Sequence, residues 1–261
     1  MGVLETLRGN YAKELLDKGV REDMRGLHEF RKITIKKSVI QHAEGSAQVD
    51  IGNTRVLAGV KLMVEEPMED TPDQGNLIMN AELLPMASAD YETGPPSPES
   101  IELARVVDRG IRAGPAVDLQ SLLIEEGKCW SVFVDVYVLN YAGNLFDASQ
   151  LAAMTALIDT HIPKYENGKV IREERSGRLK IDKIIASTTF GKIGSSLLLD
   201  MNKYEESVAE CRFTVATDGS SVKAMQKGLS GGLTIREIDE MIDVSLEKYK
   251  ELKGLIEKAN E

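Results

Sequence analysis

The chain has 261 residues and a formal net charge of −10, with 42% hydrophobic and 28% charged residues. Such a length and composition are typical of a globular protein with one or two domains. No apolar run approaches the ~20 residues of a membrane-spanning helix. The acidic balance argues against a protein whose whole surface binds nucleic acid, but it does not exclude a local basic groove.

Residues 3–18 are predicted to form a helix that begins with acids and lacks the long apolar region of a signal peptide. The apolar side chains that recur there at helical spacing are Leu4, Leu7, Tyr11 and Leu15. The charged, glycine-containing stretch 19–33 is predicted to be a structured loop. After it, alternating apolar runs separated by turn residues predict the strands 32–40, 45–52, 54–64 and 77–87.

The next predicted helix spans residues 98–113 and has strong end signals. Ser97 is a natural N-cap, Pro98 fits the first helical position, and Glu99 suits the positive end of the helix dipole. The core-facing side chains predicted for this helix are Ile101, Ala104, Val107 and Ile111.

Two strands, 116–127 and 128–140, precede a glycine turn and a helix over residues 147–159. The apolar face of that helix is predicted to be Leu151, Met154, Ala156 and Leu157. Further strands are predicted at 183–200, 205–219 and 221–228. A last helix begins at Thr234, which forms a capping box with Glu237.

Runs of strands followed by single helices indicate an α+β fold with mixed sheets rather than a doubly wound one. The polar stretch 164–182 is the best boundary between two halves, because the second half looks like a shorter copy of the first. We therefore predict an N-terminal helix and charged loop over 1–30, a first half over 31–164, and a second half with the C-terminal helix over 180–261.

The cysteines and histidines give little indication of chemistry. Cys129 and Cys211 lie far apart in predicted strands, which is typical of buried free thiols in a reducing cytosol. The histidines, which lack metal-ligand spacing, are His28, His42 and His161.

Three arginines form one stripe on the 98–113 helix: Arg105, Arg109 and Arg112. Forked guanidinium groups bind phosphate in a bidentate way, so the stripe suits a nucleic-acid backbone. A solvated face paired with nearby acids is the other reading, and surface ion pairs are common enough to favour it on these residues alone.

Carboxylates gather after the predicted strand that ends at Asp200, where Glu205 and Glu206 follow. Such a group can bind Mg²⁺ or work as an acid–base pair, but it is more often a polar turn.

The glycine turn before the 147–159 helix raises the question of an anion site, because helix N-termini often bind phosphate. Gly143 is followed by Asn144, Leu145, Phe146 and Asp147. Two bulky apolar residues and an acid stand where the anion would lie, and Asp147 suits an N-cap. The residues therefore favour a plain strand-to-helix connection.

Several long motifs in the same order resemble the RNase PH family over nearly the whole chain: 19–33, 44–60, 100–112, 135–157 and 197–219. Within that family, the resemblance is greatest to the non-catalytic RNase PH-like subunit of the archaeal exosome. It implies an RNase PH-like fold with two duplicated βαβ-type halves. It also implies a hexameric ring of three heterodimers around a pore that admits RNA.

Departures from the family pattern bear on activity. Active members carry a Gly-Ser-Arg or Gly-Thr-Arg turn for inorganic phosphate, and here Asn144, Leu145 and Phe146 take its place. Active members also have basic residues before the first long helix, whereas residues 88–100 contain no Lys or Arg. Asp200 matches a catalytic carboxylate position and Glu206 lies near the second, so the resemblance implies vestigial carboxylates beside a degenerate phosphate turn.

The resemblance also implies that the arginine stripe faces the partner's active site and contacts RNA, through Arg105 and Arg109 first and then Arg112. The expected partners are an active RNase PH-like paralogue, RNA-binding cap proteins and single-stranded RNA, in the archaeal cytoplasm. The complex would need inorganic phosphate and Mg²⁺, with no cofactor or metal bound by this chain. Two alternatives stay open: an active phosphorolytic 3′-to-5′ exoribonuclease that uses Asp200 and Glu206, and a homo-oligomeric scaffold unrelated to RNA.

Overall fold

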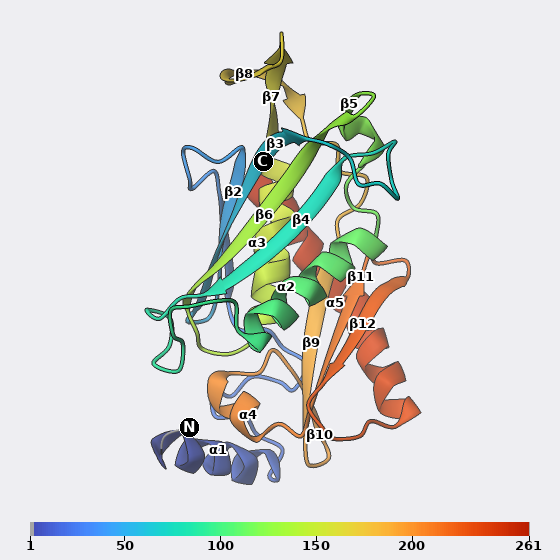
Figure 1. Ribbon diagram of the computed structural model, residues 1–261. Helices are drawn as coiled ribbons and strands as arrows, with labels where there is room; N and C mark the ends of the chain where they lie inside the picture. The colour runs from blue at the N-terminus through green and yellow to red at the C-terminus, as the bar shows by residue number, and fades with distance from the viewer. Residues whose placement is uncertain (1–2, 261) are drawn as a thin grey trace.

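The computed structural model describes residues 3–260, which form five α-helices and twelve strands (Figure 1). The helices are α1 (Val3–Leu16), α2 (Pro98–Ala113), α3 (Leu145–Asp159), α4 (Lys203–Val208) and α5 (Ile235–Asn260). The strands of the first half are β1 (Ile33–Lys37), β2 (Gly45–Ile51), β3 (Thr54–Glu65), β4 (Asn76–Leu83), β5 (Leu123–Glu125) and β6 (Lys128–Asn140). The remaining strands are β7 (His161–Glu166), β8 (Lys169–Arg178), β9 (Ala186–Ile193), β10 (Ser196–Leu199), β11 (Cys211–Thr217) and β12 (Val222–Gly228).

Two main sheets carry the fold. The first has the order β1-β2-β3-β6-β4, with β5 also paired to β6. Strand β4 runs parallel to β6 and is connected to it through α2, which is a βαβ unit, while the other pairs are antiparallel. The second sheet, β10-β9-β11-β12, is antiparallel throughout, and β7 and β8 form a separate hairpin. The predicted α+β class with mixed sheets is confirmed.

Helix α3 is the centre of the core. It packs behind the first sheet against β2 and β3, and it also contacts β9 and α5 of the second half (Figure 1). Almost all of its side chains are buried, so the four residues predicted as an apolar face are only part of its packed surface. Burial of each large apolar side chain contributes about 1.5–3 kcal/mol, which anchors the helix between the halves.

The predicted start of α2 is confirmed. The side chain of Ser97 accepts a hydrogen bond from the Ser100 amide at 3.2 Å, and Pro98 is the first helical residue. The predicted core face was wrong in one position, because Ile101 is 52% exposed. Leu103 is buried instead, since the helix is rotated so that this side chain reaches the core.

Two of the apolar side chains that recur along α1 do not lie on its buried face. Leu7 and Tyr11 are 61% and 51% exposed, while Ala12 and Leu16 are buried. The reason is Gly9, where an added Cβ would lie 2.7 Å from the hydroxyl of Ser207 on α4. The missing side chain lets the two helices approach closely, and this contact outweighs the exposure of larger apolar residues.

The beginning of the predicted strand 205–219 was also wrong, because its first residues belong to α4. Asn202 caps α4 by accepting from the amides of Tyr204 and Glu205, and the Glu205 side chain accepts from the Asn202 amide. The strand begins at Cys211, which, like Cys129, is a buried free thiol as predicted. Within residues 3–260, no helix is long and apolar enough to cross a membrane.

Candidate functional site

The turn between β6 and α3 is built for close packing. Gly143 has φ +97, and a Cβ there would lie 2.4 Å from the carbonyl oxygen of Met201 in the second half. Asn144 adopts a left-handed conformation and is the N-cap of α3. The prediction that Asp147 caps the helix was therefore wrong, because the helix begins earlier, at Leu145. The absence of a side chain at Gly143 allows the turn to pack directly against the backbone of the second half.

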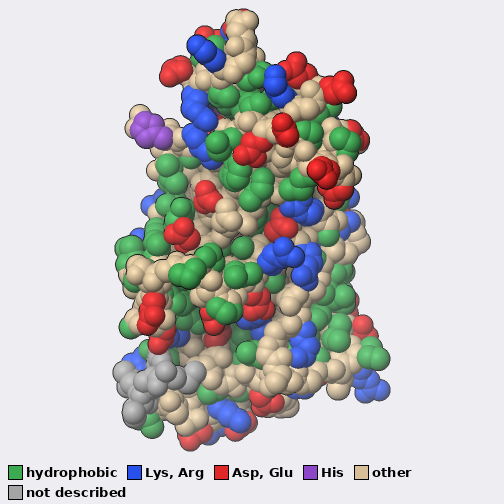
Figure 2. Space-filling model, in the orientation of Figure 1, with side chains coloured by type: hydrophobic (Ala, Val, Ile, Leu, Met, Phe, Trp, Pro, Cys, Tyr) green, Lys and Arg blue, Asp and Glu red, His purple; other side chains and the backbone are tan. Residues whose placement is uncertain are grey.

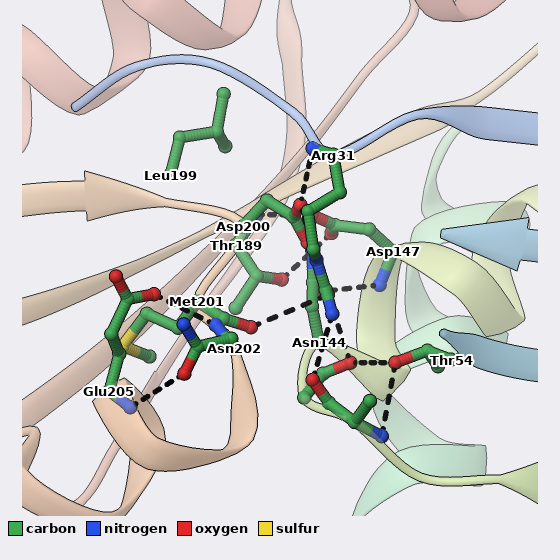
Figure 3. Close-up of polar contacts among 12 residues, drawn as sticks. Arg31, Thr54, Asn144, Asp147, Thr189, Leu199, Asp200, Met201, Asn202 and Glu205 are labelled. Carbon is green, nitrogen blue, oxygen red and sulfur yellow. Dashed lines mark hydrogen bonds and ion pairs between the residues drawn. The ribbon is translucent and has the colours of Figure 1, made fainter. Parts of the chain in front are cut away.

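The Asp147 carboxylate contacts the second sheet. It accepts hydrogen bonds from the Thr189 amide and hydroxyl, both at 2.8 Å (Figure 3). It also accepts one from the Ser187 hydroxyl at 3.0 Å. Asn144 Nδ2 donates to Asp147 at 2.9 Å and to Asp200 at 2.8 Å. Burial raises the pKa of Asp147 to about 7, against the opposing effect of these hydrogen bonds. The side chain is structural and joins α3 to β9.

The amide at the start of α3 already holds an anion from the same chain. Glu206 Oε1 accepts from the Asn144 amide at 2.7 Å, and Oε2 accepts from the Tyr141 hydroxyl at 2.6 Å. An N–H group at a helix N-terminus is where a phosphate binds in other proteins. Burial raises the pKa of Glu206, and the hydrogen bonds from Tyr141 and Asn144 oppose that shift. The Glu206 carboxylate thus takes the place of an external anion.

Asp200 is fully buried, and both of its carboxylate oxygens accept hydrogen bonds. Its carboxylate accepts hydrogen bonds from Arg31 Nε and Nη2 at 2.9 and 2.8 Å and from the Arg31 amide at 2.8 Å (Figure 3). It also accepts one from Arg25 at 3.1 Å. Burial alone would raise the pKa of Asp200, but the hydrogen bonds and charge of Arg31 outweigh it and lower that pKa. Arg31 also donates to the carbonyl oxygens of Ala142 and Gly143. The same guanidinium therefore fixes both Asp200 and the turn.

These occupied carboxylates do not fit a Mg²⁺ ion, which needs free oxygen ligands. Across residues 3–260, no group of three or more His, Cys, Asp or Glu side chains is arranged to hold a metal. Asp200 and Glu206 come close together in space through Asn144, as their shared place after one strand suggested. Neither has an oxygen free of hydrogen bonds for acid–base chemistry.

A second buried ion pair stands beside this network. Arg21 donates to Glu205 at 2.9 and 2.6 Å and to the carbonyl oxygens of Leu199 and Asp200, both at 2.8 Å. Both side chains are almost completely buried. No spacing rule relates Arg21, Arg25 or Arg31 to these buried carboxylates, since Glu205 and Asp200 lie more than 160 residues away in the chain.

A cleft of about 230 Å³ opens beside the turn. Its charged and aromatic lining includes Tyr91, Glu99, Glu102, Phe146, Glu206 and Arg212. The Arg212 guanidinium lies 4.1 Å from the centre of the Phe146 ring and forms an ion pair with Glu102. Three carboxylates against one paired guanidinium make this cleft unfavourable for phosphate.

The arginine stripe lies on the exposed side of α2, where Lys and Arg side chains gather near β12 (Figure 2). Arg112 is engaged by Asp108 at 2.8 Å and by the Leu77 carbonyl oxygen at 2.7 Å. Arg109 donates one hydrogen bond, to Gln226 at 2.7 Å. Arg105 has no side-chain partner among the described residues. Arg105 and Arg109 therefore keep most of their donors for a ligand.

Comparisons with known proteins agree over both halves. Residues 29–163 match the first domain of the 3′ exoribonuclease family (RNase PH), and residues 183–248 match its second domain. A protein of Thermococcus gammatolerans, named exosome complex component Rrp42, is 46% identical over 248 residues, covering 93% of this chain and 91% of its own length. The protein of the same name from Archaeoglobus fulgidus is 45% identical, covering 96% of this chain and 98% of its own.

Chains of solved archaeal exosome structures are also similar to this chain over nearly its whole length. A chain of the Archaeoglobus fulgidus exosome with RNA bound to the active site has a TM-score of 0.92 at 44% identity, covering 97% of this chain and 99% of that one. A chain of an archaeal exosome core has a TM-score of 0.87 at 42% identity, and the match covers 99% of this chain and 98% of that one. Rice Rrp46, with a TM-score of 0.69 at 16% identity, shares the fold.

Proposed function

The chain belongs to the 3′ exoribonuclease (RNase PH) family, and we propose that it is the non-catalytic subunit of an archaeal RNA exosome. In this proposal, it alternates with an active RNase PH-like paralogue in a hexameric cytoplasmic ring, to which RNA-binding cap proteins attach. It shapes the paralogue's active site and positions single-stranded RNA for 3′-to-5′ phosphorolysis, which consumes inorganic phosphate and needs Mg²⁺ at the paralogue's sites. The relatives named as exosome components support this role.

The observation that carries the proposal is the contact between Glu206 and the Asn144 amide at 2.7 Å. Phosphorolysis needs an inorganic phosphate bound next to the scissile bond, and here a carboxylate of the chain takes up the helix N-terminus. Asp200, the other candidate for catalysis, forms hydrogen bonds with Arg31 and Asn144. The alternative of an independently active enzyme has no free phosphate site to support it.

The first test is release of nucleoside diphosphates from a short RNA in the presence of phosphate and Mg²⁺. We expect no release by the purified chain and release when the paralogue is added to form the ring. Asp200→Asn in this chain should lower its stability, because Arg31 loses a buried anion, but rings that assemble with the variant should keep their turnover. Release by the chain alone, lost in Asp200→Asn, would show that the carboxylate is catalytic and that the proposal is wrong.

The second prediction concerns the stripe on α2. In the ring, replacing Arg105 and Arg109 together with glutamate should weaken binding of single-stranded RNA by at least about tenfold and lower the slope of log affinity against log salt by about 1.4, since each lost phosphate contact removes about 0.7. Arg112→Glu should have a smaller effect, because its guanidinium is held by Asp108.

The matched control is the pair Arg236→Glu and Lys258→Glu, which makes the same charge change at exposed positions of α5. This control should leave RNA affinity unchanged, and light scattering should show intact rings for all variants. Equal affinities for the α2 variant and the control would remove RNA positioning from the proposed role.

A further inference from the structure

The β7–β8 hairpin projects from the body of the molecule at the end opposite α1 (Figure 1). Near its tip, the charges are balanced, because Lys164 pairs with both Glu166 and Glu174 at 3.0 Å. At its base, Arg175 and Arg178 are exposed, and neither has a side-chain hydrogen bond or ion pair among the described residues. The base of the hairpin therefore carries two uncompensated guanidinium groups.

The strand register places these groups on one face with a histidine. Arg178 is opposite His161, and Arg175 is opposite Pro163, with an extra residue in β8 between the two pairs. Directly opposed residues of an antiparallel pair share a face, and so do residues two apart in one strand. Arg175, Arg178 and His161 thus lie on one face, which we call the hairpin face.

The charges of Arg175 and Arg178 also act on His161. Its pKa is lowered by burial first and then by the charges of Arg175 and Arg178, with Asp159 opposing the shift. Asp159 keeps its negative charge beside His161, and its carboxylate accepts hydrogen bonds from the amide and hydroxyl of Ser38 and from the Ser46 amide. Among the described residues, neither Asp159 nor the unpaired Glu173 forms an ion pair with Arg175 or Arg178, so both guanidinium groups stay available to a ligand.

The composition of the hairpin favours a nucleic acid over a protein as the ligand. Among residues 161–180, no large hydrophobic side chain is exposed. A protein interface usually has an apolar centre, whereas exposed guanidinium groups without apolar neighbours suit phosphate oxygens. The hairpin also projects away from α2 (Figure 1). The two ends of α3, one at the Asn144 turn and one at the hairpin, are roughly 22 Å apart, at ~1.5 Å per residue for its 15 residues.

We propose that the hairpin face, formed by Arg175, Arg178 and His161, is a second contact for the phosphodiester backbone of single-stranded RNA. This rests on the proposed function, because it concerns RNA that reaches the same ring. A contact this far from α2 is reached only by an RNA several nucleotides longer than one that fills the site beside α2. The hairpin face would hold the upstream part of the strand while its 3′ end is shortened.

The test compares a fluorescein-labelled 30-nucleotide oligoadenylate with a 6-nucleotide one, on reconstituted rings without inorganic phosphate. For the pair Arg175→Glu and Arg178→Glu, we expect affinity for the long RNA to fall about five- to tenfold and the salt slope to fall by about 1.4, with no change for the short RNA. The pair Arg175→Gln and Arg178→Gln should show a smaller change of the same kind, which covers the case in which the glutamate pair does not assemble. The Arg236→Glu and Lys258→Glu pair is again the control.

The outcomes separate this proposal from the proposed function. Unchanged affinity and slope for the long RNA, while the Arg105 and Arg109 variant still binds weakly, would overturn the hairpin contact and leave the subunit role intact. An equal loss for the short and long RNAs would also overturn it, because the effect would then come from the site beside α2. If neither variant changes RNA binding, the hairpin contact is overturned and RNA positioning is removed from the proposed role of the subunit.

Discussion

Replacing Arg21 with methionine is expected to lower the free energy of unfolding by about 3–5 kcal/mol. The substitution keeps an unbranched side chain of similar reach but leaves the Glu205 carboxylate buried without its cation. It also removes the donors to the carbonyl oxygens of Leu199 and Asp200. Urea unfolding of the purified chain, followed by circular dichroism, measures the change.

The matched control is Arg55→Met. Arg55 and Asp50 form a pair of similar length, 2.7 Å, but the Arg55 side chain is half exposed. Loss of an exposed pair costs about 0–1 kcal/mol. Adding Glu205→Leu to Arg21→Met should recover part of the lost stability, because the unpaired charge is removed as well. A loss for Arg21→Met no larger than that for Arg55→Met would show that burial does not govern this ion pair.

Gly143→Ala is expected to lower the free energy of unfolding by about 2–5 kcal/mol, since backbone strain and overpacking each cost about 1–3 kcal/mol. Gly143 has φ +97, and the new Cβ would lie 2.4 Å from the Met201 carbonyl oxygen and 2.5 Å from the Asn202 carbonyl carbon. Both are backbone atoms, so the two halves must move apart to admit the methyl group.

The variant Gly168→Ala measures the cost of backbone strain without a steric overlap of the new methyl group. Gly168 in the hairpin turn also has a positive φ, +76, but nothing lies within 4 Å of its added Cβ. The free energy of unfolding of this variant should therefore fall only by the cost of a left-handed alanine backbone, about 1–2 kcal/mol. Equal losses in the two variants, measured by the same urea experiment, would mean that the contact between Gly143 and Met201 has no energetic weight.

Local signals in the sequence predicted local structure well. Ser97 and Pro98 set the start of α2 because a cap needs only neighbours along the chain. The same holds for Thr234 and Glu237, where the Glu237 amide donates to the Thr234 hydroxyl and the Glu237 carboxylate accepts from the Thr234 amide, as predicted. In both cases, the partners are at most three residues apart.

Long-range contacts could not be predicted in this way. Arg31 and Asp200 are 169 residues apart, and no spacing rule relates them. Asp200 and Glu206 were identified as candidates, but whether a carboxylate is free or engaged depends on which side chains the fold brings to it. The buried face of α1 could not be predicted for a related reason. The contact made possible by Gly9 depends on the position of α4, which the sequence of α1 does not contain.

The bond between Glu206 and the Asn144 amide has a consequence for regulation. A tethered group competes with free molecules at an effective concentration of about millimolar or more, and it is never diluted. Dissolved phosphate must displace a carboxylate that stays attached to the same polypeptide. In the proposed ring, a rise or fall of the phosphate concentration in the cell would therefore act on the paralogue alone. The corresponding turns of this chain, in half of the ring's subunits, would not bind phosphate at any concentration in the cell.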